Sequence, residues 1–377
     1  MSLKRASTSS LLALALMGVC LYAVSERTLT PVHAEAYRKK QDALRLMQKA
    51  EEAILAAKKQ RNVAIDLKND PDRTGVVGPQ FTLITTDQGT QGAKALSAHP
   101  NFAAAVTQMM LQAGVGEGDL VAVGMTGSLP GMNLAVLSAC KVIGAEPLII
   151  TSVGSSMFGA TDPEMTWLDM EAVVAERKIL PYRSMAASLG GGGDVGRGLS
   201  PAGRQLMLDA MRRHEVRAIQ AETLLEAVHQ RVALYDEAAA RLGKPIKLYV
   251  NVGGGLASLG GTQNSRLIPA GLTLRLTARN YPNRGAINIY AERGLPILNL
   301  LEVEKLARQL EITDAAGEPV QTGTGLVFIM HRYNLWIVGA SALLLLVANF
   351  VVLRLDIRQQ ILGRPHPERT NHHEAHT

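Results

Sequence analysis

Two long apolar segments lie near the two ends of the chain. Residues 335–353 form a run of 19 residues without a charged side chain, close to the roughly 20 apolar residues that a membrane-spanning helix needs. Residues 9–24 form a shorter run after Lys4 and Arg5, a pattern that fits both an uncleaved anchor and a cleavable signal peptide. We expect an uncleaved anchor, and therefore two transmembrane helices.

Basic side chains lie outside both apolar segments, next to the ends of the chain. The positive-inside rule therefore predicts that residues 1–8 and 354–377 are cytoplasmic. The same rule puts residues from about 25 to 334 on the outer side of the cytoplasmic (inner) membrane, and cleavage of the first segment would export the same domain. We interpret the histidine-containing end of the chain as a solvated tail, with adventitious metal binding as the alternative.

Residues 34–68 carry apolar side chains at steps of three and four residues, such as Ala43, Met47 and Ile54. This spacing predicts one amphipathic helix with a charged outer face. At 1.5 Å per residue it would be a stalk about 50 Å long, free-standing or packed along another helix.

Short apolar runs alternate with helical periodicity between residues 75 and 330. We predict an α/β domain with a mainly parallel sheet and helices on both faces, because strand–helix–strand order implies parallel pairing with a right-handed crossover. A helical insertion is predicted at about 190–243. The predicted strands are residues 81–85, 120–125, 147–153, 246–252 and 296–300, and the predicted helices are residues 102–113, 134–143 and 302–310.

Composition supports this fold class and excludes one class of function. Aromatic residues make up only 4% of the chain, whereas 35 residues are glycine, as expected for strands that end in tight turns. Residues 25–334 contain 33 basic and 30 acidic side chains, so their net charge is only about +3. This balance argues against nucleic-acid binding. Cys20 and Cys140 suggest no disulfide framework.

The loop over residues 124–133, GMTGSLPGMN, joins a predicted strand to a predicted helix. Its small residues would let backbone N–H groups converge on an anion such as a carboxylate or a phosphate. The alternative is a tight turn that only starts the helix, since neither the Walker pattern nor the dinucleotide-binding spacing is present. The candidate ligand-binding residues of this loop are Thr126, Gly127, Ser128, Gly131 and Asn133.

Two further loops follow predicted strands, where open α/β sheets bind ligands. In the loop over residues 152–169 the candidates are Ser155, Ser156 and Asp162, whereas we expect Asp169 to start the following helix. The third loop, residues 251–261, offers close backbone approach at its glycines. Its candidates are Asn251, Gly253, Gly254 and Gly255. We predict that all three loops meet at one edge of the sheet.

Signals for catalysis are weak. Ser128 is a possible nucleophile, but its neighbours do not match the hydrolase elbow pattern. No histidine lies in a glycine-rich loop, and the acidic residues after Thr161 lack the spacing of a metal site. The sequence therefore specifies neither a metal nor a cofactor, and it leaves open whether the protein is an enzyme.

Three motifs resemble the poly-gamma-glutamate system proteins (PgsW-like): GSLPGMNLAVLSA, SVGSSMFGATDPEMTWLDME, and NVGGGLASLGG followed by LIPAGL. The resemblance implies action with the ligase and membrane subunits that make and export poly-gamma-glutamate, a polyanionic capsule or released polymer. It carries over no catalytic residue. Two hypotheses follow: a noncatalytic accessory subunit that holds polymer carboxylates or a partner, or an exported amide-bond hydrolase or transferase. The lack of an evident nucleophile–base pair favours the first.

Overall fold

The computed structural model describes residues 8–277 and 279–362, which divide into two compact units. One unit consists of residues 33–329 and holds the α/β domain. The other consists of the segments before residue 33 and after residue 329, and it contains two long apolar helices. Of the predicted cytoplasmic ends, residues 1–8 and 354–377, the parts over residues 1–7 and 363–377, with the tail histidines, lie outside the described residues.

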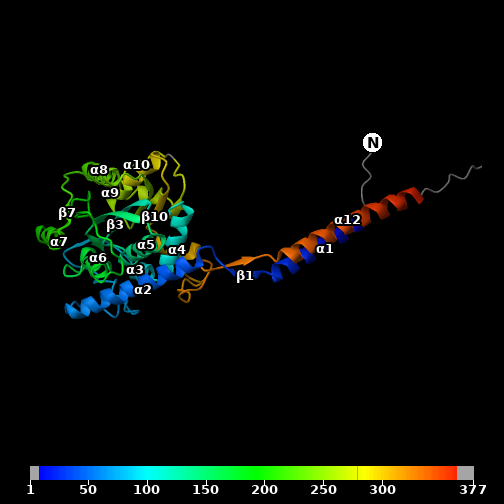
Figure 1. Cartoon of the computed structure of the whole chain (residues 1–377), viewed down its shortest axis with the longest axis horizontal. Helices are drawn as coiled ribbons and strands as arrows, with labels where there is room; N and C mark the ends of the chain where they lie inside the picture. The colour runs from blue at the N-terminus through cyan, green and yellow to red at the C-terminus, as the bar shows by residue number, and fades with distance from the viewer. Residues whose placement is uncertain (1–7, 278, 363–377) are drawn as a thin grey trace, which may run out of the picture. The chain divides into compact units, whose positions relative to one another are not determined.

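A seven-stranded sheet forms the centre of the α/β unit (Figure 1). Six of its strands run parallel, and the edge strand β9 pairs antiparallel with β10. The α/β class with a mainly parallel sheet is therefore confirmed. In spatial order the strands are β7 (Arg217–Ala218), β6 (Ala186–Ser188), β4 (Glu146–Ser152), β3 (Leu120–Thr126), β8 (Ile246–Val252), β10 (Ile297–Leu300) and β9 (Gly271–Thr273).

The order of the strands reverses at the middle of the sheet. The chain enters at β3, continues outward through β4, β6 and β7, and then returns to β8 on the other side of β3. Because the connections on the two sides diverge, such a reversal opens a crevice at the carboxyl ends of the central strands.

Alternate side chains of the central strands lie in different hydrophobic clusters. Val121 and Val123 of β3 pack with α4 (Asn101–Gln112) and α5 (Pro130–Ile143). Leu120 and Ala122 pack with α8 (Leu224–Leu242) and α10 (Ala286–Glu292). In Figure 1, α8 and α10 lie across the strands from α5 and α6 (Trp167–Glu176). The two-residue period of a strand accounts for this division.

The predicted stalk is a helix of the α/β unit. Helix α2 spans Tyr37–Gln60, shorter than the predicted 34–68, and it packs against α4 and α5. Its apolar stripe, including Ala43, Met47 and Ile54, is fully buried. The amphipathic spacing was thus interpreted correctly as a helix, and the alternative of packing along another helix agrees with the structure. The helix does not form a separate stalk, because its stripe completes the main core.

Two other sequence predictions need correction. Residues 81–85 do not form an apolar strand, since Phe81 and Leu83 are exposed; the strand here is β2 (Thr85–Asp87), which pairs with β5 (Ser155–Ser156). Residues 190–243 are more than a helical insertion, because β7 extends the sheet between α7 (Pro201–Arg213) and α8. The remaining short helices are α3 (Gln91–Ser97), α9 (Leu256–Leu259), a 3₁₀ turn (Asn264–Arg266) and α11 (Val303–Gln309).

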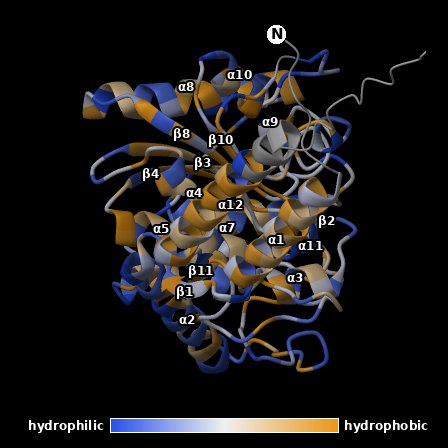
Figure 2. Ribbon diagram, turned by 90° about the vertical axis from the view of Figure 1, so that its right-hand side faces the viewer, coloured by the Kyte–Doolittle hydropathy of each residue, from blue (hydrophilic) through white to orange (hydrophobic). Residues whose placement is uncertain are grey.

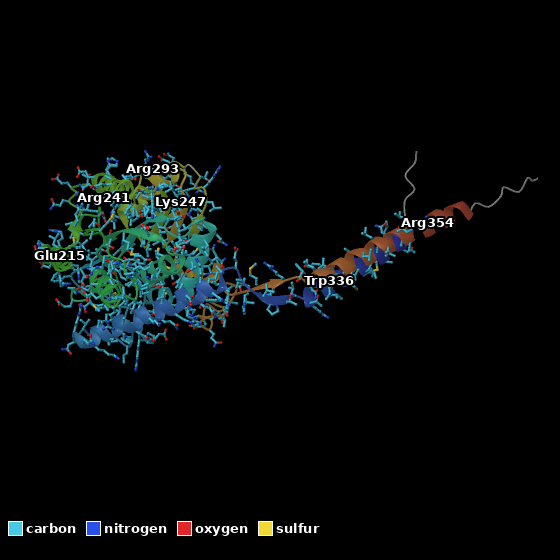
Figure 3. All side chains as sticks on the ribbon, in the orientation of Figure 1. Glu215, Arg241, Lys247, Arg293, Trp336 and Arg354 are labelled. Atoms are coloured by element: carbon cyan, nitrogen blue, oxygen red, sulfur yellow. The ribbon has the colours of Figure 1, made fainter. Side chains whose placement is uncertain are left out.

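Helices α1 (Thr8–Arg27) and α12 (Leu335–Leu362) pack along each other in the second unit. Strands β1 (Thr30–His33) and β11 (Ile329–Arg332) pair beside them. Both helices are long and apolar enough to cross a membrane, a test that a signal sequence also passes. The ribbon in Figure 2 is coloured as hydrophobic over much of both helices, and Figure 3 shows Trp336 and Arg354 toward opposite ends of α12. The two predicted apolar segments therefore lie on helices, while their orientation in a membrane stays a prediction.

Candidate functional site

A cavity of about 570 Å³ lies at the carboxyl ends of β3, β4 and β8, at the reversal of strand order. All three glycine-rich loops contribute to its lining, which confirms the prediction that they meet at one edge of the sheet. Six of the predicted ligand-binding residues line it: Thr126, Ser128, Ser156, Gly253, Gly254 and Gly255.

Two glycines let these loops approach one another closely. A Cβ atom on Gly253, whose φ of +83° already favours glycine, would lie 2.3 Å from Thr126 Oγ1. A Cβ atom on Gly127 would lie 2.6 Å from the carbonyl oxygen of Val153. The glycines therefore bring the hydroxyl side chains of neighbouring loops to a common cavity.

Lys94 is the main residue of the site that the sequence did not indicate. It lies on the short helix α3, is only 5% exposed, and lines the cavity. Its Nζ donates hydrogen bonds to the backbone carbonyl of Ser128 and to Ser156 Oγ, the latter at 2.7 Å. Burial lowers the pKa of Lys94 to about 8, partly opposed by the charge of Asp87. A polar segment with one lysine gave no sequence signal for this position.

Two serines from different loops are joined beside Lys94. The backbone N–H of Ser156 donates to Ser128 Oγ at 3.0 Å, so the hydroxyl hydrogen of Ser128 can be donated to a ligand. Ser155 is buried instead, and its hydroxyl donates to the carbonyl of Gly127 at 3.0 Å. Ser128 and Ser156 therefore face the cavity, while Ser155 connects the loops behind it.

Gly127 and four other predicted residues also lie outside the cavity lining. Gly131 packs against α3, where a Cβ atom would lie 2.6 Å from the carbonyl oxygen of Ser97. The amide Nδ2 of Asn133 donates to the Thr126 carbonyl at 2.9 Å, and that of Asn251 donates to Asn299 Oδ1 at 2.8 Å. Asp162 accepts the backbone N–H of Glu164. These contacts position the loops.

A fourth glycine-rich loop, over residues 190–198, also reaches the cavity through Gly190, Gly191 and Gly192. A buried ion pair fixes it: Arg231 Nη2 lies 3.0 Å from Asp194 Oδ2. The hydroxyl of Ser152 accepts from Arg231 and donates to Asp194, both at 2.8 Å. Helix α8 thereby holds the loop against the end of β4.

Asp169 has the structural role expected from the sequence. Together with Thr166 it forms a capping box at the start of α6, and it also accepts hydrogen bonds from Arg213 and His214. Burial would raise the pKa of Asp169, but the hydrogen bonds from His214, Arg213 and Thr166 outweigh it and lower the pKa to about 2.

The charged side chains lining the cavity are Lys94, Arg197 and Asp87, which leaves an excess of one positive charge. Within residues 8–277 and 279–362, no group of three or more His, Cys, Asp or Glu side chains could hold a metal ion. A larger cavity, about 910 Å³, lies between α2, α3 and α11, and its lining is rich in carboxylates such as Glu51 and Glu52. It receives no residue from the three loops.

Comparisons with protein-family models, with curated proteins and with solved structures found no match to this chain.

Proposed function

We propose that the protein is a membrane-anchored accessory component of a bacterial system that makes and exports poly-gamma-glutamate. Its cavity at the ends of β3, β4 and β8 binds a carboxylate-rich ligand, either the polymer or a partner. The α/β unit lies outside the cytoplasmic membrane, with both ends of the chain in the cytoplasm. The ligase and membrane subunits of the same system are its partners.

The observation that carries the binding proposal is the position of Lys94. Its Nζ bonds the backbone carbonyl of Ser128 and the hydroxyl of Ser156 rather than a carboxylate. A ligand carboxylate would supply the missing opposite charge, and charge-assisted hydrogen bonds are stronger than neutral ones. Arg197 lines the same cavity, so a chain with repeated carboxylates could be held at more than one point.

The pathway rests on the sequence resemblance of the three loop motifs, three of whose serines, Ser128, Ser152 and Ser156, line the cavity. The extracytoplasmic orientation rests on the basic residues outside the apolar segments. Reporter fusions at Gly75 and after Gly363 test the orientation, and a cytoplasmic signal at Gly75 would contradict it.

One contact favours a second candidate function, an exported amide-bond hydrolase or transferase acting on poly-gamma-glutamate. The 2.7 Å contact between Lys94 Nζ and Ser156 Oγ joins a base to a hydroxyl nucleophile. The sequence alone gave no such pair.

Calorimetric titration of the detergent-extracted full chain with oligo-γ-glutamate tests the binding proposal. We expect Lys94→Met to weaken binding about tenfold or more, since it removes a partly desolvated charge–carboxylate contact. Lys247→Met is the matched control, because Lys247 is exposed on β8 and does not line the cavity (it is labelled in Figure 3). Equal affinity of wild type and Lys94→Met would contradict the proposed site.

A further inference from the structure

We propose that Ser156 is a nucleophile that attacks an amide carbonyl held in this cavity, with Lys94 Nζ as its general base. The inference deepens the proposed function and rests on it for the carboxylate-bearing substrate. The geometry of three groups on three separate segments points to it: the Ser156 hydroxyl, the Lys94 amine and the Ser128 hydroxyl.

The contact between Lys94 and Ser156 has the length that proton transfer requires. A general base must lie within about 2.6–3.2 Å of the atom that carries the proton, and Nζ lies 2.7 Å from Ser156 Oγ. The second contact of Nζ, with the Ser128 carbonyl, fixes the direction of the amine. A neutral amine can donate to this carbonyl and still accept the Ser156 proton with its lone pair.

Ser156 is the nucleophile rather than Ser128 because the two serines meet Lys94 differently. Lys94 contacts the hydroxyl of Ser156 but the backbone carbonyl of Ser128. Ser128 Oγ instead accepts the Ser156 backbone N–H. This bond orients Ser128 as a donor that can contact a carbonyl oxygen or a carboxylate of the substrate.

Burial makes the Lys94 amine easier to deprotonate, as a general base requires. The side chain is almost completely covered, and burial lowers the pKa of Lys94 to about 8, so a useful fraction of the amine is neutral near neutral pH. The other charged side chains of the cavity are Asp87, which favours the protonated amine and partly opposes this shift, and Arg197.

The reaction balances with water as the only co-reactant. Lys94 takes the hydroxyl proton while Ser156 Oγ bonds to the amide carbon, and the amine leaves with that proton as the C–N bond breaks. An ester on Ser156 remains. Water then attacks the ester carbon, its proton passes through Lys94 to Ser156 Oγ, and a carboxylic acid leaves. An acceptor amine in place of water would give transfer.

The substrate class follows from the same cavity. An amide with a carboxylate close to its carbonyl, as in a γ-glutamyl chain, would place the anion toward Arg197 and the Ser128 hydroxyl and the carbonyl at Ser156, so that Lys94 stays free to act as the base. About 570 Å³ accommodates a few residues of such a chain.

A fluorophosphonate probe tests the nucleophile without relying on a substrate. The full chain is treated with the probe in detergent, and peptide mass spectrometry locates the adduct. We expect labelling at Ser156, its loss in Ser156→Ala, and a rate about 10²-fold lower in Lys94→Met. Ser138→Ala is the matched serine control, because Ser138 is buried in α5 away from the cavity.

The pH profile of the wild-type chain gives a second measurement that does not depend on how a variant folds. The labelling rate should rise with pH, reach half its maximum near pH 8 and level off above about pH 9, following deprotonation of Lys94. A flat profile from pH 6 to 9 would overturn the role of Lys94, and an unlabelled Ser156 would overturn the nucleophile.

Titration with oligo-γ-glutamate separates the two proposals. Binding by a wild-type chain whose Ser156 is not labelled overturns this inference and leaves the proposed function. Labelling of Ser156 without oligomer binding supports the nucleophile and overturns the carboxylate ligand. Binding by Ser156→Ala, together with oligomer shortening by the wild type only, supports both.

Discussion

Arg231 and Lys94 are both buried cations at the carboxyl edge of the sheet, but their surroundings differ. Arg231 is 2% exposed and bonds the Asp194 carboxylate and two serine hydroxyls, so a full counter-charge accompanies it. Lys94 is 5% exposed, bonds a carbonyl and a hydroxyl, and lines the cavity.

This difference separates a structural charge from a reactive one. A paired buried ion keeps its charge, and removal of one partner leaves the other uncompensated. A buried amine without a bonded carboxylate loses its proton more easily, and so it can act as a base or receive an anionic ligand. The carboxyl edge of this sheet contains both kinds.

The largest expected effect comes from breaking the paired ion. Arg231→Met leaves the Asp194 carboxylate buried without its cation, so we expect a loss of about 3–5 kcal/mol in the free energy of unfolding. Chemical unfolding of the detergent-extracted chain measures it. Arg241→Met, in the exposed pair with Glu237 (Figure 3), should change stability by less than about 1 kcal/mol. Equal losses of stability in Arg231→Met and Arg241→Met would show that the buried ion pair contributes no more than the exposed one.

Asp169 is a buried anion that, like Arg231, is paired with groups of opposite charge. Its pKa falls from 3.8 to about 2 on folding, so its stabilisation is present above pH 4 and is lost as the pH falls through 2. We expect Asp169→Asn to cost about 2 kcal/mol at pH 7. The stability difference between wild type and variant should shrink between pH 4 and pH 2, and a difference that stays constant over this range would contradict the assignment.

The sequence predicted those parts of the site that repeat a local pattern. Strand β8 has the predicted bounds, 246–252, because a largely apolar run ends at three glycines. The loops after β3, β4 and β8 were found because a parallel sheet places the ends of such strands together. The meeting of Thr126, Ser156 and Gly254 thus followed from strand order alone.

Long-range placement could not be predicted. Lys94 reaches Ser156 across 62 residues of sequence, from a short polar helix without a periodic pattern. The stripe of α2 showed that the helix has an apolar side but not which surface covers it, so its place in the main core was not predicted. Strands β6 and β7 were missed because they have only three and two residues.

Lys94→Met should affect stability much less than Arg231→Met. Folding lowers the pKa of Lys94 from 10.5 to about 8. Below pH 8 this shift lowers the free energy of unfolding by about 3 kcal/mol, and the loss disappears as the pH rises to 10.5. The variant removes this unfavourable contribution, but it leaves the Ser128 carbonyl and the Ser156 hydroxyl without a donor. The lost hydrogen bonds lower the free energy of unfolding by about 1–3 kcal/mol. We expect stability within about 1 kcal/mol of wild type at pH 7, by thermal unfolding. A loss as large as that of Arg231→Met would make Lys94 a structural cation.

The smallest effect is expected at Ser138, a buried polar group that has neither a partner nor a cavity. Its side chain is fully buried in α5, and its hydroxyl has no hydrogen-bond partner within the described part of the chain. Alanine removes this unsatisfied group and is the better helix former, so Ser138→Ala should stabilise the domain by about 0.5–1 kcal/mol. For a domain of this size the melting temperature would rise by about 1–4 °C. The small cavity left by the lost oxygen works against this gain, but one atom in a close-packed helix costs less than an unpaired hydroxyl.

A lower melting temperature would show that Ser138 is hydrogen-bonded after all. A higher one, with ligand binding and Ser156 labelling unchanged, would show that burial of a polar group identifies a site only when the group also faces a cavity, as Lys94 does.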